Sequence, residues 1–304
     1  MSAFAVALNL LLVQQPATVE DVLARVRTAI GYEKLAQHAP GWHVVGKGRY
    51  FGEPGAYDLL FTPSGHFVER VTGPLGTTHA YDGKETWEAD WTGDTLTLAL
   101  RDRDLVLTSM AILTGRWLAT DAPYDVRLVA DDDDAVVTVQ VAFRGGRHKT
   151  RVEVDGGTWL PKREFYEGSA GLSITTLADW RDTPAGRVPH RVDVSEGGLT
   201  NTVTIDKVAK APTFVRSPFE RLPWTPADTK FDPAKPAAVE IKRLPSGHLI
   251  VHPRVNGKDV GGFLLDSGAG SMVIDPKIAD ELGMPKFGEI PVVGIGGALL
   301  GHFR

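Results

Sequence analysis

The spacing of apolar and polar positions changes along the chain, and it divides the chain into segments. Near the start, apolar residues recur at helical spacing after Thr18, a capping residue followed by acids in the first turn. Gly31 marks the predicted end of this helix. The apolar positions that define it are Val19, Val22, Leu23, Val26 and Ile30. The sequence therefore predicts one amphipathic helix at the start of the first folded region.

From about Trp42 to Val208, short apolar or alternating runs are separated by Gly, Pro and Asp turns, which is typical of antiparallel strands. Residues 105–118 are the exception, because their apolar positions suit a helix. Strands are expected near residues 44–50, 57–61, 66–71, 80–87, 124–129, 135–143, 149–154, 172–180, 187–195 and 201–208. A strongly curved sheet with helices on one face is a natural way to bury such a pattern.

Residues 209–238 contain six of the 20 prolines of the chain, a density that disfavours both helix and central strand. This segment is predicted to be an extended linker. The expected division is therefore a possible signal segment at residues 1–17, a β domain at 18–208, the linker at 209–238 and a second domain at 239–304.

The last segment restarts a β pattern. Runs at residues 239–242, 249–255, 261–265 and 271–274 read as strands, and Asn256-Gly257 is a strong hairpin signal. Asp275 followed by Pro276 predicts the start of a short helix that ends before Gly283.

Composition excludes several classes of function. The hydrophobic content of 42% and charged content of 23% are ordinary for a soluble globular protein. A net charge of −5 gives no reason to expect nucleic-acid binding. Because the chain has no cysteine, disulfides, zinc–thiolate sites and cysteine nucleophiles are excluded. Its nine histidines do not cluster, so neither a metal nor a cofactor is expected.

The N-terminal apolar run at residues 3–13 is too short to span a bilayer as a helix. It has the length of a signal-peptide core, although no Lys or Arg precedes it and Gln15 does not suit a cleavage site after Ala17. We expect export to the bacterial periplasm or cell envelope. A mis-assigned start or an ordinary packed helix is the alternative.

Three motifs in the first domain occur in an order that resembles the bacterial outer-membrane lipoprotein carriers and sensors. They are Tyr81-Asp82-Gly83 with Trp87, Val152-Glu153-Val154-Asp155 with Leu160-Pro161, and Asp179-Trp180-Arg181 with Gly186-Arg187-Val188-Pro189. The resemblance implies a half-barrel of antiparallel strands covered by helices, often with an apolar cavity. Tryptophans 42, 87, 91, 117, 159 and 180 are accordingly expected to line a core or cavity, rather than to form a sugar-binding platform.

The stretch Asp266-Ser267-Gly268-Ala269-Gly270 carries the chemistry of the last domain. It places a short carboxylate directly after the apolar run at residues 262–265, in a turn with little side-chain bulk. Two such carboxylates about 3 Å apart cannot both ionise, so they share a proton and act as acid and base on a water molecule. The alternative is a tight turn in which Asp266 caps a backbone amide.

This motif, with the Asn256-Gly257 hairpin before it, resembles the retroviral-type, single-lobe aspartic peptidases. The resemblance covers residues 239–304 and implies Asp266, Ser267 and Gly268 as catalytic residues. It also implies a substrate-binding flap at Gly294, Ile295, Gly296 and Gly297, for which an ordinary hairpin is the alternative. Since the chain has only one such motif, the resemblance implies a homodimer that cleaves peptides.

The sequence departs from that family after the flap, because no apolar-Gly support strand follows before Arg304. We therefore expect this sequence to be a fragment of a longer chain, whose activity depends on residues that this sequence does not contain. The competing interpretation is a non-enzymatic envelope protein whose first domain binds lipid or lipopeptide and whose peptidase lobe is degenerate.

Overall fold

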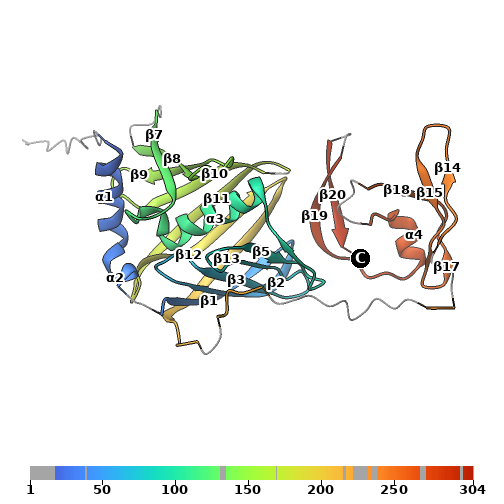
Figure 1. Cartoon of the computed structure of the whole chain (residues 1–304), viewed down its shortest axis with the longest axis horizontal. Coiled ribbons are helices and arrows are strands. Elements are labelled where there is room, and N and C mark those ends of the chain that lie inside the picture. Colours follow the sequence, from blue (N-terminus) through green and yellow to red (C-terminus); the bar gives the residue numbers. More distant parts are fainter. Residues whose placement is uncertain are drawn as a thin grey trace, which may run out of the picture. The chain divides into compact units, whose positions relative to one another are not determined.

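The computed structural model describes residues 18–37, 40–130, 135–168, 170–214, 217–221, 232–234, 238–267, 272–294 and 297–303. The chain separates into two compact units: Met1–Trp224 with Glu289–Gly301, and Thr225–Gly288 with His302–Arg304. The predicted signal segment at residues 1–17 lies outside the described residues. The prediction of a mainly β protein with a curved antiparallel sheet is confirmed (Figure 1).

Thirteen antiparallel strands form one sheet in the first unit, in the order β6-β5-β4-β3-β2-β1-β13-β12-β11-β10-β9-β8-β7. Their bounds are β1 Trp42–Tyr50, β2 Glu53–Phe61, β3 Phe67–Thr72, β4 Thr78–Tyr81, β5 Thr86–Ala89, β6 Thr95–Thr97, β7 Tyr124–Val129, β8 Val136–Phe143, β9 Thr150–Asp155, β10 Pro161–Gly168, β11 Gly171–Thr183, β12 Gly186–Glu196 and β13 Leu199–Lys210. All neighbours are consecutive in sequence except β1 and β13, which pair from Trp42 with Lys210 to Arg49 with Thr202. The sheet is therefore two meanders joined by its first and last strands.

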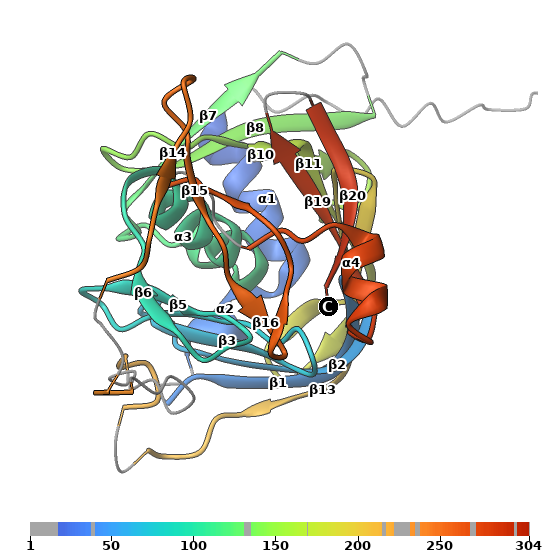
Figure 2. The same ribbon diagram turned by 90° about the vertical axis from the view of Figure 1, so that its right-hand side faces the viewer.

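The helices of this unit are α1 Val19–Ile30, α2 Tyr32–Ala36 and α3 Leu100–Thr114, followed by the 3₁₀ turn η1 Arg116–Leu118. Because α3 and η1 connect the two edge strands β6 and β7, the chain crosses the concave side of the sheet at this point. Figure 2 shows the strands as an arc around α1 and α3. The helix predicted over residues 105–118 thus exists, but it begins at Leu100, where Ala99 provides no side-chain cap.

The local signals of α1 are confirmed. The Thr18 hydroxyl accepts a hydrogen bond from the Asp21 backbone N–H, and Gly31 ends the helix with a left-handed φ of 67°. The apolar face of α1 joins one large core, in which α1, α3 and η1 cover the concave face of the sheet. Members of this core include Val22, Val26, Trp117, Leu118, Val139, Val141, Val152 and Val154, none more than 2% exposed.

The concave face also carries ionisable groups, of which Asp104 is buried and His79 is half-buried. The Asp104 carboxylate of α3 accepts hydrogen bonds from the Arg147 backbone N–H at 2.7 Å and from the Arg103 side chain at 2.6 Å. His79 lies between Glu69 and Glu88, at 3.5 and 3.6 Å. Although burial opposes the charged form of His79, hydrogen bonds to these carboxylates raise its pKa to about 9.

Glu164 on β10 lies on the same face as Val152, its register partner in β9. It is 1% exposed, and its Oε2 atom has no hydrogen-bond partner among the described residues. Burial raises the pKa of the Glu164 carboxyl to about 8. Glu164 is therefore a neutral acid inside the core at neutral pH.

The chain that follows β13 covers part of the convex face. Residues 211–214 and 217–221, here called the strap, cover apolar side chains that β2–β5 direct outward. Phe219 packs with Leu60, Val68 and Trp87, and the Trp87 indole N–H donates to the Phe219 carbonyl at 2.8 Å. Part of the segment predicted to be a linker is thus packed against the sheet.

In the second unit, β14 Lys242–Arg243, β15 Leu249–Val251 and β18 Phe263–Leu265 form a three-stranded sheet in the order β14-β15-β18. The ribbon of β16 Arg254–Val255 and β17 Lys258–Asp259 turns at Asn256-Gly257, as predicted. Helix α4 Pro276–Glu281 is also confirmed, with the Asp275 carboxylate accepting from the Lys277 N–H at 2.8 Å. Residues 272–274 are not a strand, so that expectation is wrong. The strand expected at 239–242 begins only at Lys242, as β14.

Strands β19 Phe287–Gly294 and β20 Gly297–Phe303 form a two-stranded hairpin sheet. Within the described part of the chain, no helix has the length and apolar character needed to cross a bilayer.

Substituting Glu164 tests its burial as a neutral acid. A carboxyl with a pKa near 8 in the fold and near 4.5 when unfolded binds more protons in the folded state at intermediate pH. Its contribution to the free energy of unfolding is full below pH 4.5 and falls as pH rises towards 8, by at most about 1.4 kcal/mol per pH unit. Glu164→Gln should remove this fall, measured by denaturant unfolding from pH 5 to 9.

The control is Glu167→Gln, at an exposed position on the same strand, which should keep the fall of stability with pH. Identical pH profiles of Glu164→Gln and the unsubstituted protein would contradict the burial of Glu164 as a neutral acid.

Substituting Phe219 tests the strap. Phe219→Ala removes a side chain that is 6% exposed and empties the centre of the cluster on the convex face. The free energy of unfolding of the first unit should fall by about 3 kcal/mol, followed by tryptophan fluorescence in denaturant. Leu172→Ala, at a side chain 48% exposed, is the control and should change it by less than about 0.5 kcal/mol. Equal stabilities of the two variants would show that the strap does not pack in this way.

Candidate functional site

Asp266 directly follows β18, whose three residues pair with β15 in the register Leu249–Leu265, Ile250–Leu264 and Val251–Phe263. Asp266 and Ser267 are both exposed. The predicted lead-in of an apolar strand to a carboxylate and hydroxyl pair is therefore present. Gly268, the third predicted catalytic residue, lies outside the described residues.

The turn before β18 brings the backbone into position for this strand. Asn256 and Gly257 have left-handed φ values of 51° and 76°, as a two-residue hairpin turn requires. The Asp259 carboxylate then accepts from the Gly261 N–H at 2.8 Å. At Gly262 a Cβ atom would lie 2.8 Å from the Ile250 side chain, so glycine permits the close approach of β18 to β15.

Few apolar side chains of the second unit are buried. Among its described residues only Val260 and Ala279 are buried hydrophobic side chains. Leu264 and Leu265 of β18 are 53% and 51% exposed, and Met272 is 77% exposed. Since β18 is also an edge strand of the described sheet, the surface next to Asp266 is both apolar and unpaired along its backbone.

The predicted flap residues lie at the hairpin of β19 and β20. Gly294 ends β19 and Gly297 begins β20, while Ile295 and Gly296 between them lie outside the described residues. The hairpin is thus present, and its role in substrate binding stays a prediction. In the structure, Asp266 and Ser267 are adjacent residues after β18. Gly294 and Gly297 belong to one hairpin.

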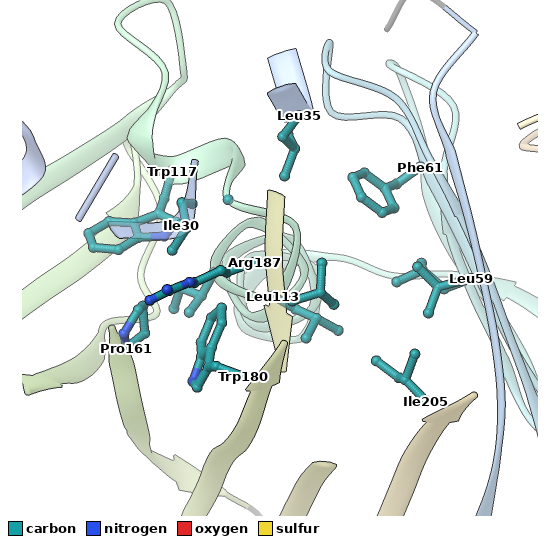
Figure 3. A pocket seen from close by; sticks show the side chains of 14 residues that line it. Ile30, Leu35, Leu59, Phe61, Leu113, Trp117, Pro161, Trp180, Arg187 and Ile205 are labelled. Carbon is teal, nitrogen blue, oxygen red and sulfur yellow. The ribbon is translucent and has the colours of Figure 1, made fainter. Parts of the chain in front are cut away.

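The first unit contains an apolar pocket between its helices and the concave face of the sheet (Figure 3). Little free space remains between the side chains, so a ligand would need some of them to rotate. Arg187 is the one charged residue among those that line it. The lining residues are Ile30, Leu35, Val44, Leu59, Phe61, Ile112, Leu113, Gly115, Trp117, Pro161, Trp180, Arg187, Val188 and Ile205.

The tryptophan prediction is confirmed for Trp42 and Trp87, which are buried in the core, and for Trp117 and Trp180, which line this pocket. Trp91 is 43% exposed and does not fit it. Sequence reasoning did not identify Arg187 as a pocket residue. No local signal marks it, because the lining residues come from elements far apart in the chain. Among the described residues, no group of three or more His, Cys, Asp or Glu side chains is placed to hold a metal ion.

Comparison with known families identifies one segment. Residues 251–302 match the model of the aspartyl protease family, which confirms the predicted resemblance over that range. The matched range includes Asp266, Ser267 and both strands of the hairpin except its last residue. No curated protein matches the chain.

Solved structures with a likeness to the chain include a LolA superfamily protein from Nitrosomonas europaea, at 13% identity and a TM-score of 0.41, over 62% of this chain and 94% of that one. A DUF1329 family protein from Desulfovibrio piger has 10% identity and a TM-score of 0.42, over 66% and 97%. The lipoprotein LppX from Mycobacterium tuberculosis has 13% identity and a TM-score of 0.25, over 64% and 98%. Likenesses this weak carry no argument about function, and the fold of the first unit rests on its own sheet topology.

Proposed function

We propose that this protein is an aspartic endopeptidase that hydrolyses peptide bonds with a water molecule activated by two Asp266 carboxylates, one from each chain of a homodimer. The position of Asp266 carries the proposal. It lies at the end of a strand whose edge and apolar side chains are exposed, in a segment that matches the aspartyl protease family. We further propose that the protein acts in the bacterial periplasm or cell envelope.

The proposed reaction needs one ionised and one protonated carboxyl. The ionised Asp266 takes a proton from water, whose oxygen attacks the peptide carbonyl carbon. The protonated Asp266 of the second copy gives its proton to the carbonyl oxygen, which yields a tetrahedral diol. The first Asp266 then gives the proton that it took from water to the nitrogen, and the C–N bond breaks. The second Asp266 takes a proton from a diol hydroxyl, so the products are an amine and a carboxylic acid and the pair again shares one proton. Because the pair of carboxyls must carry one proton for the reaction, activity should be highest at acidic pH.

Ser267, Gly268 and the hairpin have supporting roles in this proposal. The Ser267 hydroxyl would hydrogen-bond to the loop of the second copy and hold the two carboxylates together. Gly268 would let the two loops approach, because a side chain there would occupy the space between them. Gly294, Ile295, Gly296 and Gly297 would cover the bound peptide and exclude water.

Contact between two copies would also bury exposed apolar surface. Leu264, Leu265 and Met272 are exposed, so a monomer leaves their apolar surface in water. Burial of such a surface is worth about 25 cal/mol for each Å² removed from water. Dimerisation through this surface would bring two Asp266 side chains to the same interface, as the reaction requires.

The peptidase proposal is tested with Asp266→Asn in the natural full-length protein. Removal of the shared acid and base should lower peptide cleavage by about 10²–10⁴-fold at mildly acidic pH. Asp275→Asn is the matched control. Its side chain caps α4 by accepting from the Lys277 N–H, and Asn caps equally well, so cleavage should be retained.

The homodimer is tested in the same assay. Specific activity should fall on dilution, and an excess of the Asp266→Asn chain should suppress the activity of unsubstituted chains through mixed dimers. Equal cleavage by the Asp266→Asn and unsubstituted proteins would disprove the peptidase proposal.

A second function is favoured by the pocket of the first unit, which is lined mainly by apolar side chains from the helices and from the concave face of the sheet. We propose that it holds an apolar chain of a lipid or lipopeptide, either as a part of the peptidase or as the sole function of an envelope protein. Leu113→Trp should fill the pocket and abolish co-purification of lipid, detected by solvent extraction and mass spectrometry. Leu128→Trp, at an exposed position on β7, should not. Lipid content unaffected by Leu113→Trp would place the ligand elsewhere.

A further inference from the structure

The convex face of the thirteen-stranded sheet has an open hollow near edge strand β7. The hollow offers about 170 Å³, many times the roughly 10–15 Å³ that one water molecule needs. Strands β7 and β8 and the turn after β8 line it, and its lining residues include Arg127, Gln140 and Lys149. Val139 and Val141 belong to the core, so strand alternation directs Gln140, which lies between them, to the convex face. The hollow is therefore on the opposite face of the sheet from the apolar pocket.

The strand register places long polar side chains on two sides of this hollow. Arg127 on β7 is the partner of Gln140 on β8. Lys149 directly precedes β9, at the level of Ala142 on β8. Strands β7 and β9 lie two strand spacings apart, about 10 Å, with the small Ala142 side chain between them. The side chains of Arg127 and Lys149 are long enough to reach one anion in this gap from opposite sides.

The two cations that line the hollow have no counter-ion in the fold. Within the described part of the chain, neither the Arg127 guanidinium nor the Lys149 ammonium makes an ion pair or a hydrogen bond, and both residues are exposed. The Gln140 carboxamide has no hydrogen-bond partner among those residues either. On the same sheet, by contrast, Arg163 and Arg191 form ion pairs at 2.6 and 2.7 Å. The donors of the hollow are therefore available to a ligand.

The charge around the hollow is positive, although the whole chain carries a net charge of −5. Asp125 is the one acidic residue among those that line it, and its carboxylate lies 3.4 Å from the Arg144 side chain. Arg151, the register partner of Gln140 on β9, adds an exposed cation beside the hollow. The acidic run at residues 131–134 joins the other ends of β7 and β8 and lies outside the described residues. Among the described side chains, the field at the hollow therefore attracts an anion.

The turn that forms one wall of the hollow is fixed from inside the fold. The buried Asp104 carboxylate accepts from the Arg147 N–H at 2.7 Å, and the Gly146 N–H donates to the Phe143 carbonyl at 2.8 Å. A Cβ atom at Gly146 would lie 2.7 Å from the Asp104 carboxylate, so glycine permits this close contact. Lys149 follows this turn, so its backbone is already in place before a ligand binds, which lowers the entropy cost of binding.

We infer that this hollow binds a phosphate group, which the Arg127 guanidinium and the Lys149 ammonium neutralise while the Gln140 carboxamide N–H donates to a further oxygen atom. A phosphate monoester carries about 1.5 to 2 negative charges at pH 7 and three acceptor oxygen atoms, which suits two cations on opposite sides. A carboxylate carries one charge, and one arginine can satisfy both of its oxygen atoms. The inference rests on neither function proposed above. The phosphate group belongs either to a soluble phosphomonoester or to a phospholipid headgroup, and the experiment separates these two sources.

Titration calorimetry of the full chain measures the binding directly, with inorganic phosphate as the probe. Phosphate should bind at least about tenfold more tightly than acetate at the same pH and ionic strength. Sedimentation with phosphatidylcholine vesicles, with and without phosphatidate, then identifies the source of the group. Retention that requires phosphatidate assigns the hollow to a lipid headgroup, and phosphate binding without such retention assigns it to a soluble phosphomonoester.

Arg127→Gln and Lys149→Gln each remove a charge that has no partner among the described residues. Each should weaken phosphate binding by about five- to tenfold and leave the midpoint of denaturant unfolding unchanged. Asp125→Asn removes the carboxylate of the hollow and should tighten phosphate binding by about two- to fivefold. Lys207→Gln and Asp206→Asn are the matched controls, since they make the same charge changes on β13, about 24 Å from β8 along the sheet. At that separation salt screens their effect, and the affinity should stay within about twofold.

Three results would overturn the inference. Absence of phosphate binding to the unsubstituted protein is the first. Equal affinities for phosphate and acetate are the second, because the hollow would then not select a phosphate group. An effect of Lys207→Gln as large as that of Lys149→Gln is the third, because the net charge of the chain would then set the affinity. None of these results bears on the peptidase or the apolar-ligand proposal, which rest on other residues.

Discussion

The concave face of the thirteen-stranded sheet has to be covered, and the rest of the first unit follows from this constraint. An open sheet of this size does not close on itself, so one face of its apolar side chains needs helices. The chain meets this need where it must cross from edge strand β6 to edge strand β7, because α3 forms that crossing. Helix α1 adds a second layer, fixed by its cap at Thr18 and by the Arg27 side chain, which donates to the Leu118 carbonyl at 2.7 Å. The pocket lies between the helices and the sheet.

Polar groups on this face are of two kinds: those with hydrogen-bond or ion-pair partners, which stabilise the fold, and those without. Asp104 is buried and His79 is half-buried, and both have polar partners, so they help to fix α3 and the strands β3–β5 in place. Glu164, Trp117 and Trp180 each bury a polar atom without a partner. Such violations of local rules persist mainly where function uses them. The two indoles fall at the pocket, while Glu164 lies on β10, whose Pro161 lines the same pocket.

Local chemistry decided which parts of this fold could be predicted. The cap at Thr18, the turn at Asn256-Gly257 and the helix after Asp275 each depend on two to four neighbouring residues, and all three were predicted correctly. The start of α3 was not predicted because Ala99 gives no capping signal. The packing of Phe219 could not be predicted either, since it depends on an outward-facing row of Leu60, Val68 and Trp87 from three strands.

The candidate sites differ in the same way. Asp266 could be predicted as a candidate residue because its motif consists of consecutive residues. The pocket combines Trp117, Trp180 and Arg187 from separate elements, so it could not be predicted in the same way. Yet the consecutive motif is the less complete of the two, because it contributes a single carboxylate on an edge strand whose apolar side chains stay in water. The proposed reaction needs a second carboxylate. The stability of the unit needs a cover for the exposed side chains of Leu264 and Leu265. A second copy docked at β18 would meet both at once, so catalysis and the folding of this small unit would depend on the same contact.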